Sequence, residues 1–434
     1  MKGSKINVGV TIFIVPQHFL FIIKEKPPSA SYQTNHSEVH QEMHNYCINK
    51  LLNIEDVIVK KVVHADSFVQ IYLETKASEH ICPVCGAPTS RVHDYRMQTI
   101  KDLPLQTKHC YLILRKRRYS CSCGKRFYEH YNFLPRYLQR TSRLTAFIAD
   151  SFHKTISISA IAEQANVSTT TVNRILDTIS FSRPSLPNAL SIDEFKGNAS
   201  TGKYQCILVN PIRHQVLDIL PDRSQNHLID YFKAIPRSER LKLEFFVCDM
   251  WPPYTELAKI YFPNAKIVID KYHFIRQTGW AIEGVRKRIQ KTMPANLRKY
   301  YKRSRKLILT RYQKLEGEAK QSCDIMLLYN DDLRKAHFLK ERFYEICQNP
   351  KYSEQRTDFW SWIHEAESSG IPEFEKCACT YRHWVKEILN AFKYSHITNG
   401  PTEGFNNKIK VLKRSSYGIR NFEHFRTRIL MVTN

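Results

Sequence analysis

LSIDEF (residues 190–195) begins the stretch that decides the fold of this chain. Between residues 190 and 271, apolar runs of strand length alternate with amphipathic segments of helical spacing. The predicted strands are LSIDEF, YQCILVNP (204–211), QVLDILPD (215–222), LEFFVCDM (243–250) and AKIVID (265–270). The predicted helices are SQNHLIDYFKAI (224–235) and PPYTELAKIYF (252–262), which has proline in its first turn. Three strands followed by helix, strand, helix and strand indicate an α/β domain.

Two aspartates lie at or near the ends of predicted strands. Asp193 lies in the first strand and Asp249 in the fourth. This order of strands and helices is that of the ribonuclease H-like fold, in which the first and fourth strands carry neighbouring acidic residues. A single aspartate at a strand end is weak evidence of a site, but the pair in this order predicts that both acids belong to one site.

A third acid, Glu403, lies in NGPTEGFNNKIKVLKR (399–414), a basic segment of helical spacing that follows a turn. We expect Thr402 to cap this helix. Glu403 and Lys410 are seven residues apart and share one face of it. Three carboxylates suit Mg²⁺, and two such ions assist phosphodiester chemistry by activating the attacking oxygen and stabilising the leaving one. The alternative is a capping acid on a basic surface helix.

The composition indicates a polyanionic partner. The chain has 434 residues, enough for two or three domains, with 66 Lys and Arg against 41 Asp and Glu, a formal charge of +25. Such an excess attracts nucleic acid and predicts salt-sensitive binding. The alternative is a soluble protein that is merely basic, because positive charge alone does not establish nucleic-acid binding.

Two tight cysteine pairs, CPVCG (82–86) and CSCG (121–124), predict a zinc site. The glycine after each pair permits the tight backbone turn around a metal. Four protein ligands leave no position for water, so the ion is expected to be structural. The predicted ligands are Cys82, Cys85, Cys121 and Cys123. The alternative is a set of free or buried thiols, and His93, His109 and Cys110 are left out of the ligand set.

The region on both sides of the second pair is rich in positive charge. It contacts phosphate or forms a solvated basic face, and the pattern does not separate these alternatives. The residues concerned are Arg115, Lys116, Arg117, Arg118, Lys125 and Arg126. Other cysteines, such as Cys206 and Cys248, lie in apolar runs and are expected to pack as small hydrophobes in a reducing compartment.

ISISAIAEQANVSTTTVNRIL (156–176) has the apolar spacing of two short helices. We expect one helix over residues 159–165, a turn over 166–168, and a second helix over 169–179 that Ser168 or Thr169 caps. This is the pattern of a helix-turn-helix, whose second helix enters the major groove of DNA. The predicted DNA-facing residues are Thr169, Thr170, Asn173 and Arg174. The alternative is an ordinary helical hairpin.

Residues 274–394 have a helical and strongly basic pattern. Between Val285 and Leu315 there are twelve Lys and Arg and no acid, which favours DNA contact over a solvated helix pair. Trp360, Trp362 and Trp384 are expected in the core rather than stacked on bases. The first 42 residues contain a broken apolar run that is short for a membrane span and are expected to be an extension of the folded protein.

These patterns divide the chain into six segments. They are an extension or linker (1–45), a zinc-binding β module (46–135), a helix-turn-helix (140–182), the first part of an α/β core (188–275), an all-α insertion (276–394) and the final core helices (395–434). The fold class is therefore α/β, a ribonuclease H-like core interrupted by helices and preceded by two small modules.

From about Met43 to the C-terminus, the chain resembles the ISL-three group of bacterial insertion-sequence transposases. The motifs CPVCG and CSCG, the helix-turn-helix, SIDEF, VCDMWPPY (247–254), VIDKYHF (268–274) and NGPTEGFNNKIKVLKR occur in this order in that group. The last motif is the most specific. The resemblance implies a DDE transposase that binds the terminal inverted repeats of its element, cuts DNA there and joins the 3′-hydroxyl to target DNA.

The resemblance also implies roles for residues at the matching positions. Asp193, Asp249 and Glu403 are the expected catalytic acids, holding two Mg²⁺ or Mn²⁺ ions, and Zn²⁺ is structural. The expected supporting residues are Asp270, His273 and Lys410, and Arg414 joins the DNA-binding residues. The expected partners are double-stranded DNA, as element ends and target, and a second copy of the chain in the synaptic complex, with no membrane.

Two other functions fit the same parts. A non-catalytic DNA-binding regulator derived from a transposase keeps the zinc module and helix-turn-helix, and it binds DNA without cutting. A ribonuclease H-like nuclease acting on branched DNA or RNA cuts without joining. The expected location in each case is the bacterial cytoplasm, in association with the nucleoid.

Overall fold

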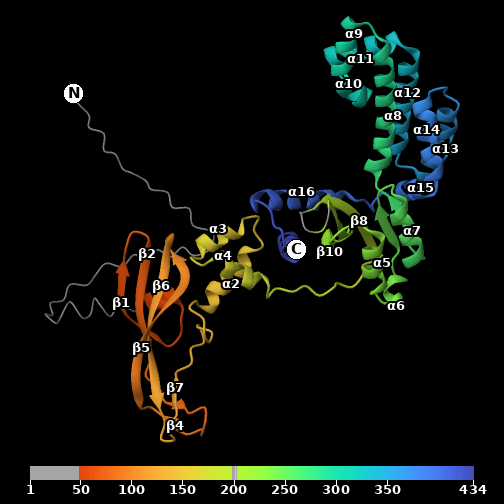
Figure 1. Ribbon diagram of the computed structural model, residues 1–434. Coiled ribbons are helices and arrows are strands. Elements are labelled where there is room, and N and C mark those ends of the chain that lie inside the picture. The colour runs from red at the N-terminus through yellow and green to blue at the C-terminus, as the bar shows by residue number, and fades with distance from the viewer. Residues whose placement is uncertain (1–47, 198–200, 202) are drawn as a thin grey trace, which may run out of the picture.

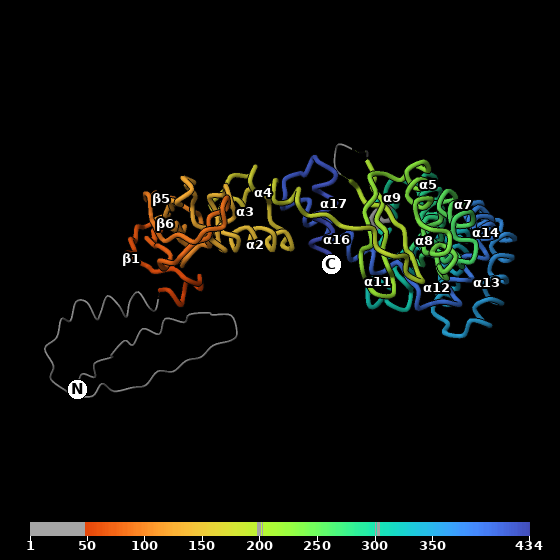
Figure 2. The backbone as a smooth tube through the Cα atoms, turned by 90° about the horizontal axis from the view of Figure 1, so that it is seen from below, coloured from red at the N-terminus to blue at the C-terminus, as the bar shows by residue number. Residues whose placement is uncertain are grey.

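The computed structural model describes residues 48–197, 201 and 203–434. The expected N-terminal extension, residues 1–45, lies outside the described residues. Figure 1 shows an N-terminal β module, a small helical module, an α/β domain and a helical domain that projects from it. Figures 1 and 2 agree that the β module and the helical domain lie at opposite ends of the molecule, with the C-terminus near the middle.

The N-terminal module is built on a five-stranded sheet in which β6 is central. Its strands are β1 (Val57–His64), β2 (Phe68–Thr75), β5 (Val92–Leu105), β6 (Lys108–Ser120) and β7 (Arg126–Tyr128). β1 and β2 form an antiparallel hairpin, β2 pairs with β6 in parallel, and β5 pairs with β6 in a long antiparallel hairpin. A small ladder of β3 (His80–Ile81) and β4 (Pro88–Thr89) carries the first cysteine pair.

The helical module has three helices, α2 (Ser142–Ser151), α3 (Ile158–Gln164) and α4 (Thr169–Leu176). The two predicted helices are confirmed as α3 and α4, and α2 precedes them. Thr141, Ser157 and Ser168 cap the three helices, each accepting the backbone N–H of the residue three positions further on. Asn166, at φ +51°, makes the turn between α3 and α4. The apolar faces of all three helices share one small core.

The α/β domain contains a mixed five-stranded sheet in the order β10-β9-β8-β11-β12. Its strands are β8 (Ala189–Lys196), β9 (Tyr204–Asn210), β10 (Gln215–Leu220), β11 (Phe245–Cys248) and β12 (Lys266–Ile269). β8, β9 and β10 are antiparallel neighbours, whereas β11 is parallel to β8 and to β12. All five predicted strands are confirmed, as are the helices α5 (Gln225–Lys233) and α7 (Pro252–Tyr261); the short α6 (Arg237–Arg240) is additional.

Helices cover both faces of this sheet, because its strands carry apolar side chains on both sides. On one face, Leu228 of α5 and Tyr254 of α7 join a core with Leu190 and Ile192 of β8. On the other face lie α16 (Gly400–Ser415) and α17 (Phe422–Thr433), whose apolar residues pack on β9 and β10. The last two helices of the chain therefore complete the domain that residues 189–270 begin (Figure 1).

The helical domain lies between β12 and α16 in the sequence. Its elements are α8 (Lys271–Thr292), α9 (Ala295–Arg303), α10 (Arg305–Leu309), η1 (Tyr312–Lys314), α11 (Gly317–Tyr329), α12 (Asp331–Gln348), α13 (Tyr352–Glu367), α14 (Pro372–His383) and α15 (Val385–Lys393). Its core contains Phe343, Trp362 and Tyr381. Trp362 and Trp384 are buried, as expected, and Trp360 is partly buried against the same core.

The basic stretch over residues 285–315 is partly neutralised within this domain. Arg286 forms a buried ion pair with Glu283, and Arg288 pairs with both Asp332 and Glu373. The absence of acids within the stretch therefore does not leave all twelve charges uncompensated, because folding brings acids from α8, α12 and α14 to this segment. Of the helices that the structure describes, none combines the length and the apolar composition that a bilayer crossing requires.

Candidate functional site

Three aspartates lie level with one another on, or directly after, three adjacent parallel strands. Asp249 directly follows β11, and Asp193 lies in β8, each two residues beyond the paired positions Val247 and Ser191. Asp270 directly follows β12, next to the pair formed by Cys248 and Ile269. Because parallel strands end at the same edge of a sheet, this register gathers the three carboxylates at one edge.

Helix α16 contacts strand β8 through its first two turns. The Ser191 hydroxyl donates a hydrogen bond to Asn399 Oδ1 and lies 3.3 Å from the Thr402 hydroxyl. One helical turn later, Asn406 Nδ2 donates to Asp193 Oδ2 at 3.0 Å. Glu403 lies between these contacts, exposed on the first turn of the helix. The contacts therefore fix the start of α16 at the aspartate edge.

The prediction that Thr402 caps this helix is wrong. α16 begins at Gly400, with Asn399 in the cap position and Pro401 in the first turn. Thr402 is fully buried, and its hydroxyl faces Ser191 rather than a free backbone N–H. Proline at the first turn and a buried contact to β8 start the helix earlier than a capping rule alone predicts.

Burial and mutual repulsion raise the pKa values of the three aspartates at this edge. Burial, with the charges of Asp270 and Glu194, raises the pKa of Asp193 to about 6. Burial, with the charges of Glu194 and Asp193, raises the pKa of Asp249 to about 7. Burial, with the charge of Glu403, raises the pKa of Asp270 to about 6. The four acids predicted from the sequence therefore form one electrostatically connected set.

Two buried acceptors at this edge lack a hydrogen-bond donor, namely Asp249 Oδ1 and Asn406 Oδ1. Unpartnered buried oxygens and mutually repelling carboxylates are relieved by a cation, and oxygen donors of this kind suit Mg²⁺ or Mn²⁺. Within the described part of the chain, only the four cysteines of the predicted zinc site bring three or more potential metal-ligand atoms within 4.8 Å of one another. The carboxylates are thus associated but more widely spaced.

Sequence reasoning missed Glu194 and Arg223. Arg223 Nη1 lies 2.8 and 2.9 Å from the two Glu194 carboxylate oxygens, and Tyr254 donates to Glu194 at 3.2 Å. The Arg223 guanidinium also lies 4.9 Å from the centre of the Trp251 ring. Glu194 was visible as the second acid of SIDEF, but its partner Arg223 comes from the loop after β10 and carried no local signal.

The predicted supporting residues lie on the two helices that flank the edge. His273 is partly buried in the first turn of α8, and its backbone N–H donates to the Asp270 carbonyl. Lys410 and Arg414 are exposed on α16 and line a groove of about 420 Å³ with Glu194 and Asn406. The positive charges of α16 therefore lie beside the acidic edge, and Asp270 and His273 lie at the other side of that edge.

The four predicted zinc ligands converge. Cys82 Sγ lies 3.7 Å from Cys123 Sγ, and Cys85 Sγ lies 3.4 Å from Cys121 Sγ. Zn–S bonds of about 2.3 Å in a regular tetrahedron give S···S edges of about 3.8 Å, so the cluster fits one zinc ion. Gly86 (φ +71°) and Gly124 (φ +82°) donate their N–H groups back to the carbonyls of Cys82 and Cys121. These two tight turns, residues 82–86 and 121–124, are the zinc knuckles.

Hydrogen bonding also favours the thiolate form of one of the four cysteines. The backbone N–H of Cys123, followed by the Cys85 thiol, lowers the pKa of Cys121 to about 6, which favours the thiolate that zinc requires. Cys206 and Cys248 are fully buried in the apolar core, as expected, and the described cysteines are free thiols.

The predicted DNA-facing residues lie on α4. Thr169 and Thr170 are exposed in its first turn, Arg174 is exposed one turn later, and Asn173 is partly buried. The Ser168 hydroxyl accepts the Thr171 N–H at 3.2 Å and fixes the start of the helix. α4 therefore presents its N-terminal side chains outward while Val172 and Leu176 pack inward.

Three family models match the chain in register with these parts. The model described as "zinc-finger of transposase IS204/IS1001/IS1096/IS1165" matches residues 78–123, and that described as "Helix-turn-helix domain of transposase family ISL3" matches residues 129–180. The DDE-type ISL3 model, described as "Transposase", matches residues 190–429, more than half of the chain.

Two curated relatives are similar to the chain. The transposase for insertion sequence element IS1001 of Bordetella parapertussis is 28% identical over 374 residues, which are 82% of this chain and 89% of that protein. An "ATP-dependent protease" of Lactococcus lactis subsp. lactis is 36% identical over 91 residues, only 20% of this chain and 29% of that protein. The long match and the three models agree: the chain belongs to the ISL3 family of insertion-sequence transposases.

Proposed function

We propose that this protein binds the terminal inverted repeats of an insertion sequence and catalyses metal-dependent DNA cleavage and strand transfer. Asp193, Asp249 and Glu403 are the catalytic acids of the proposal. The observation that carries it is the set of largely buried carboxylates at one level of β8, β11 and β12, namely Asp193, Asp249 and Asp270, which α16 completes with Glu403. Acids that repel one another in this way are retained at a cost to folding, which is typical of functional sites.

The topology supports a ribonuclease H-like core. The sheet order β10-β9-β8-β11-β12, with the first three strands of the domain antiparallel and the last two parallel to β8, is the order of that fold. The helical domain α8–α15 then corresponds to the expected all-α insertion between the aspartates and the glutamate. The insertion separates Asp270 from Glu403 by more than a hundred residues in sequence, but not in space.

The residues of the site divide into ligands and supports. Asp193, Asp249 and Glu403 would hold two Mg²⁺ or Mn²⁺ ions, which activate the attacking oxygen and stabilise the leaving one when bound. Asn406 orients Asp193 through its hydrogen bond, and Arg223 offsets the charge of the adjacent Glu194. The cations of α16, Lys410 and Arg414, lie where they meet DNA phosphates.

DNA binding in this proposal depends on the N-terminal modules. Thr169, Thr170, Asn173 and Arg174 of α4 contact the edges of bases in the major groove. A structural Zn²⁺ holds the two knuckles together, and the synaptic complex contains two copies of the chain. Target DNA approaches the acidic edge beside Lys410 and Arg414.

Replacing each catalytic acid tests the enzyme. Asp193→Ala, Asp249→Ala and Glu403→Ala should each abolish cleavage and joining of a labelled element end in Mg²⁺ while binding of that end stays nearly intact. Loss of a positioned metal ligand removes the charge stabilisation on which the reaction depends. Glu423→Ala, an exposed acid at the start of α17, is the matched control and should retain activity.

The same assay separates the rival functions. A DNA-binding regulator derived from a transposase would bind the labelled end without cutting it. A nuclease would cut but would form no joined product. Cleavage that persists in Glu403→Ala would remove this residue from the catalytic set.

A further inference from the structure

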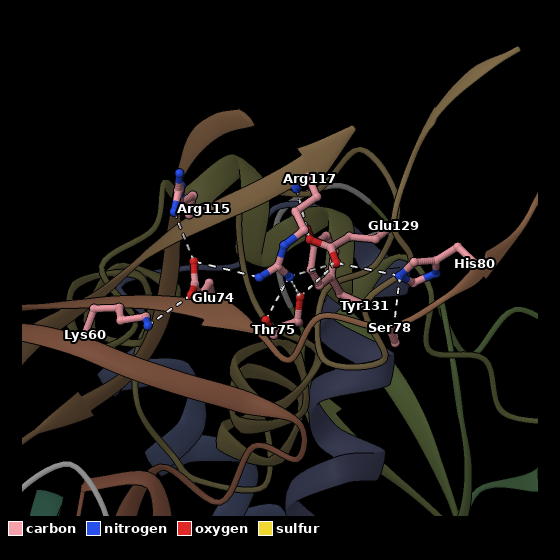
Figure 3. Close-up of polar contacts among 9 residues, drawn as sticks. All are labelled: Lys60, Glu74, Thr75, Ser78, His80, Arg115, Arg117, Glu129 and Tyr131. Atoms are coloured by element: carbon pink, nitrogen blue, oxygen red, sulfur yellow. Dashed lines mark hydrogen bonds and ion pairs between the residues drawn. The ribbon is translucent and has the colours of Figure 1, made fainter. Parts of the chain in front are cut away.

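The basic residues around strand β6 separate into two groups once the chain is folded. Three arginines of the strand pair with acids of the same module. The pairs are Arg115–Glu74, Arg117–Glu129 and Arg118–Asp94. Figure 3 shows the first two, with Arg117 also donating to the carbonyl and hydroxyl oxygens of Thr75. These arginines serve the module itself, so they are not the part of the basic stretch that is free for phosphate.

The remaining cations line one groove. It has a volume of about 780 Å³ and lies between the zinc knuckles and the segment 131–139. We call it the knuckle groove and define it by Lys116, Lys125, Arg126, Arg136 and Tyr137. Within the described part of the chain, the side chains of Lys125, Arg126 and Arg136 form no ion pair. Lys116 lies 5.0 Å from the centre of the Tyr128 ring, so the groove combines positive charge with aromatic walls.

A strained turn projects into solvent at this groove. The Leu138 N–H donates to the Pro135 carbonyl, and Gln98 Nε2 donates to the Leu138 carbonyl at 3.2 Å, so the turn is anchored on β5. Its third residue, Tyr137, has φ +65°, where glycine is strongly favoured over a residue with a side chain. Tyr137 is 95% exposed. Its ring lies 6.0 Å from the Arg136 guanidinium, a contact between neighbours that does not require this conformation.

The folded chain therefore gains little from a tyrosine at this position. Burial does not stabilise its ring, and the backbone conformation disfavours it. Strained residues that the protein itself does not use are concentrated at binding sites. A ring held outward beside unpaired cations suits a ligand that offers both negative charge and flat or apolar surface.

We propose that the knuckle groove binds the sugar–phosphate backbone of duplex DNA. Lys125, Arg126 and Arg136 contact phosphates, and the ring of Tyr137 packs against deoxyribose. The proposal rests on the proposed function, because the duplex is the element end that α4 also contacts. Tyr137 lies only four residues before Thr141, the cap of α2, so the two modules engage one continuous DNA segment.

The first test measures the salt dependence of binding. Lys125→Gln, Arg126→Gln and Arg136→Gln should each weaken binding to duplex carrying the element end, and each should reduce the slope of log K against log salt by about 0.9. Lys60→Gln is the matched control, because this exposed lysine of the same module pairs with Glu74. Its slope should equal that of the wild type. Zinc content, measured for every variant, shows that the knuckles remain intact.

The second test separates a binding role from a structural one. Tyr137→Gly should raise Tm, because glycine relieves the positive φ, and should weaken duplex binding about fivefold or more. A structural role for the ring predicts a lower Tm instead. Unchanged affinity in Tyr137→Gly, or unchanged salt slopes in all three glutamine variants, would overturn the proposal, as would preference for single strands over duplex. If wild-type protein fails to bind or join element ends, the proposed function fails instead.

Discussion

At the scale of residues, the ionised carboxylates of the acidic edge lower the stability of the metal-free protein. Asp193 in β8 lies level with Asp249 and Asp270, which directly follow β11 and β12, and this register places largely buried charges near one another. The two unpartnered acceptors, Asp249 Oδ1 and Asn406 Oδ1, lie in the same place. Each carboxylate would be more stable neutral, so the metal-free protein is expected to become less stable as these groups ionise.

Asp249 gives a signed prediction of pH dependence. Its folded pKa, about 7, lies above the usual value of 3.8, so the folded state holds a proton that the unfolded state releases between these values. The free energy of unfolding therefore falls as pH rises from about 4 to about 7. Asp249→Asn should abolish this loss and stabilise the protein at pH 8 by up to about 4 kcal/mol, with little effect near pH 4.

The measurement is urea unfolding of zinc-loaded protein in buffer free of magnesium and manganese. Asp230→Asn, which removes an exposed carboxylate of α5, is the control and should change the pH profile little. If Asp249→Asn destabilises the protein equally at pH 5 and pH 8, Asp249 does not titrate as proposed.

At the scale of elements, the zinc knuckles hold the far end of the N-terminal module. β3, β4 and β7 are two or three residues long, too short to be stable alone. Nearby, the ring of Tyr119 is buried against His80, which precedes the first cysteine pair in the sequence, and Phe127, which follows the second. No described residue of β3, β4 or β7 belongs to the hydrophobic core of the module, so a bound zinc ion would supply stability that apolar burial does not.

Removing zinc should loosen this end selectively. A chelator should increase amide hydrogen exchange in β3, β4 and β7, because the thiolates lose the ion that joins the two cysteine pairs. Exchange in β8 and β11 should stay as in the zinc-loaded protein. Exchange measured by mass spectrometry checks the prediction, and added Zn²⁺ should restore protection. Cys110→Ala, at a buried cysteine outside the cluster, should keep its zinc.

At the scale of the whole molecule, α17 joins the helix-turn-helix to the α/β domain. Arg428, fully buried, donates from Nη2 to the carbonyls of Lys154 and Ile156 at 2.8 and 2.9 Å. On the same helix, Arg426 Nε donates to Asp218 of β10 at 2.6 Å. One helix therefore contacts both the helix-turn-helix and the α/β sheet, and Figure 2 shows α17 between these two parts.

Removing the Arg428 contacts should lower the rate of DNA cleavage while leaving the binding of element ends largely intact. Arg428→Met removes two charge-assisted hydrogen bonds and should lower the cleavage rate about tenfold or more while end binding changes little. Arg428→Lys, which keeps a donor, should recover part of the rate. Mapping of cleavage positions on a labelled end should show a broader distribution for Arg428→Met. Equal loss of binding and cleavage would indicate general unfolding rather than loss of positioning.

Prediction from sequence succeeded where the signal was local and periodic. The five strands of the α/β domain follow from short apolar runs, and α4 follows from Ser168 and the spacing of Val172 and Leu176. β5 was not predicted, because its residues are mostly polar and its stability comes from pairing along the whole of β6. The start of α16 was misplaced because Thr402 resembles a cap but serves as a buried contact.

Local chemistry in the chain was enough to identify the zinc ligands, the helix-turn-helix and the acids Asp193, Asp249 and Glu403 as candidates. Cysteine spacing, capping residues and strand ends are short-range features, so they can be recognised without knowing what packs where. Folding alone decided that Asp270 lies level with the other aspartates, that Arg223 neutralises Glu194, and that the β6 arginines are paired while the knuckle-groove cations are not. Strand register and helix docking set these distances, and they bring together residues that are far apart in the chain.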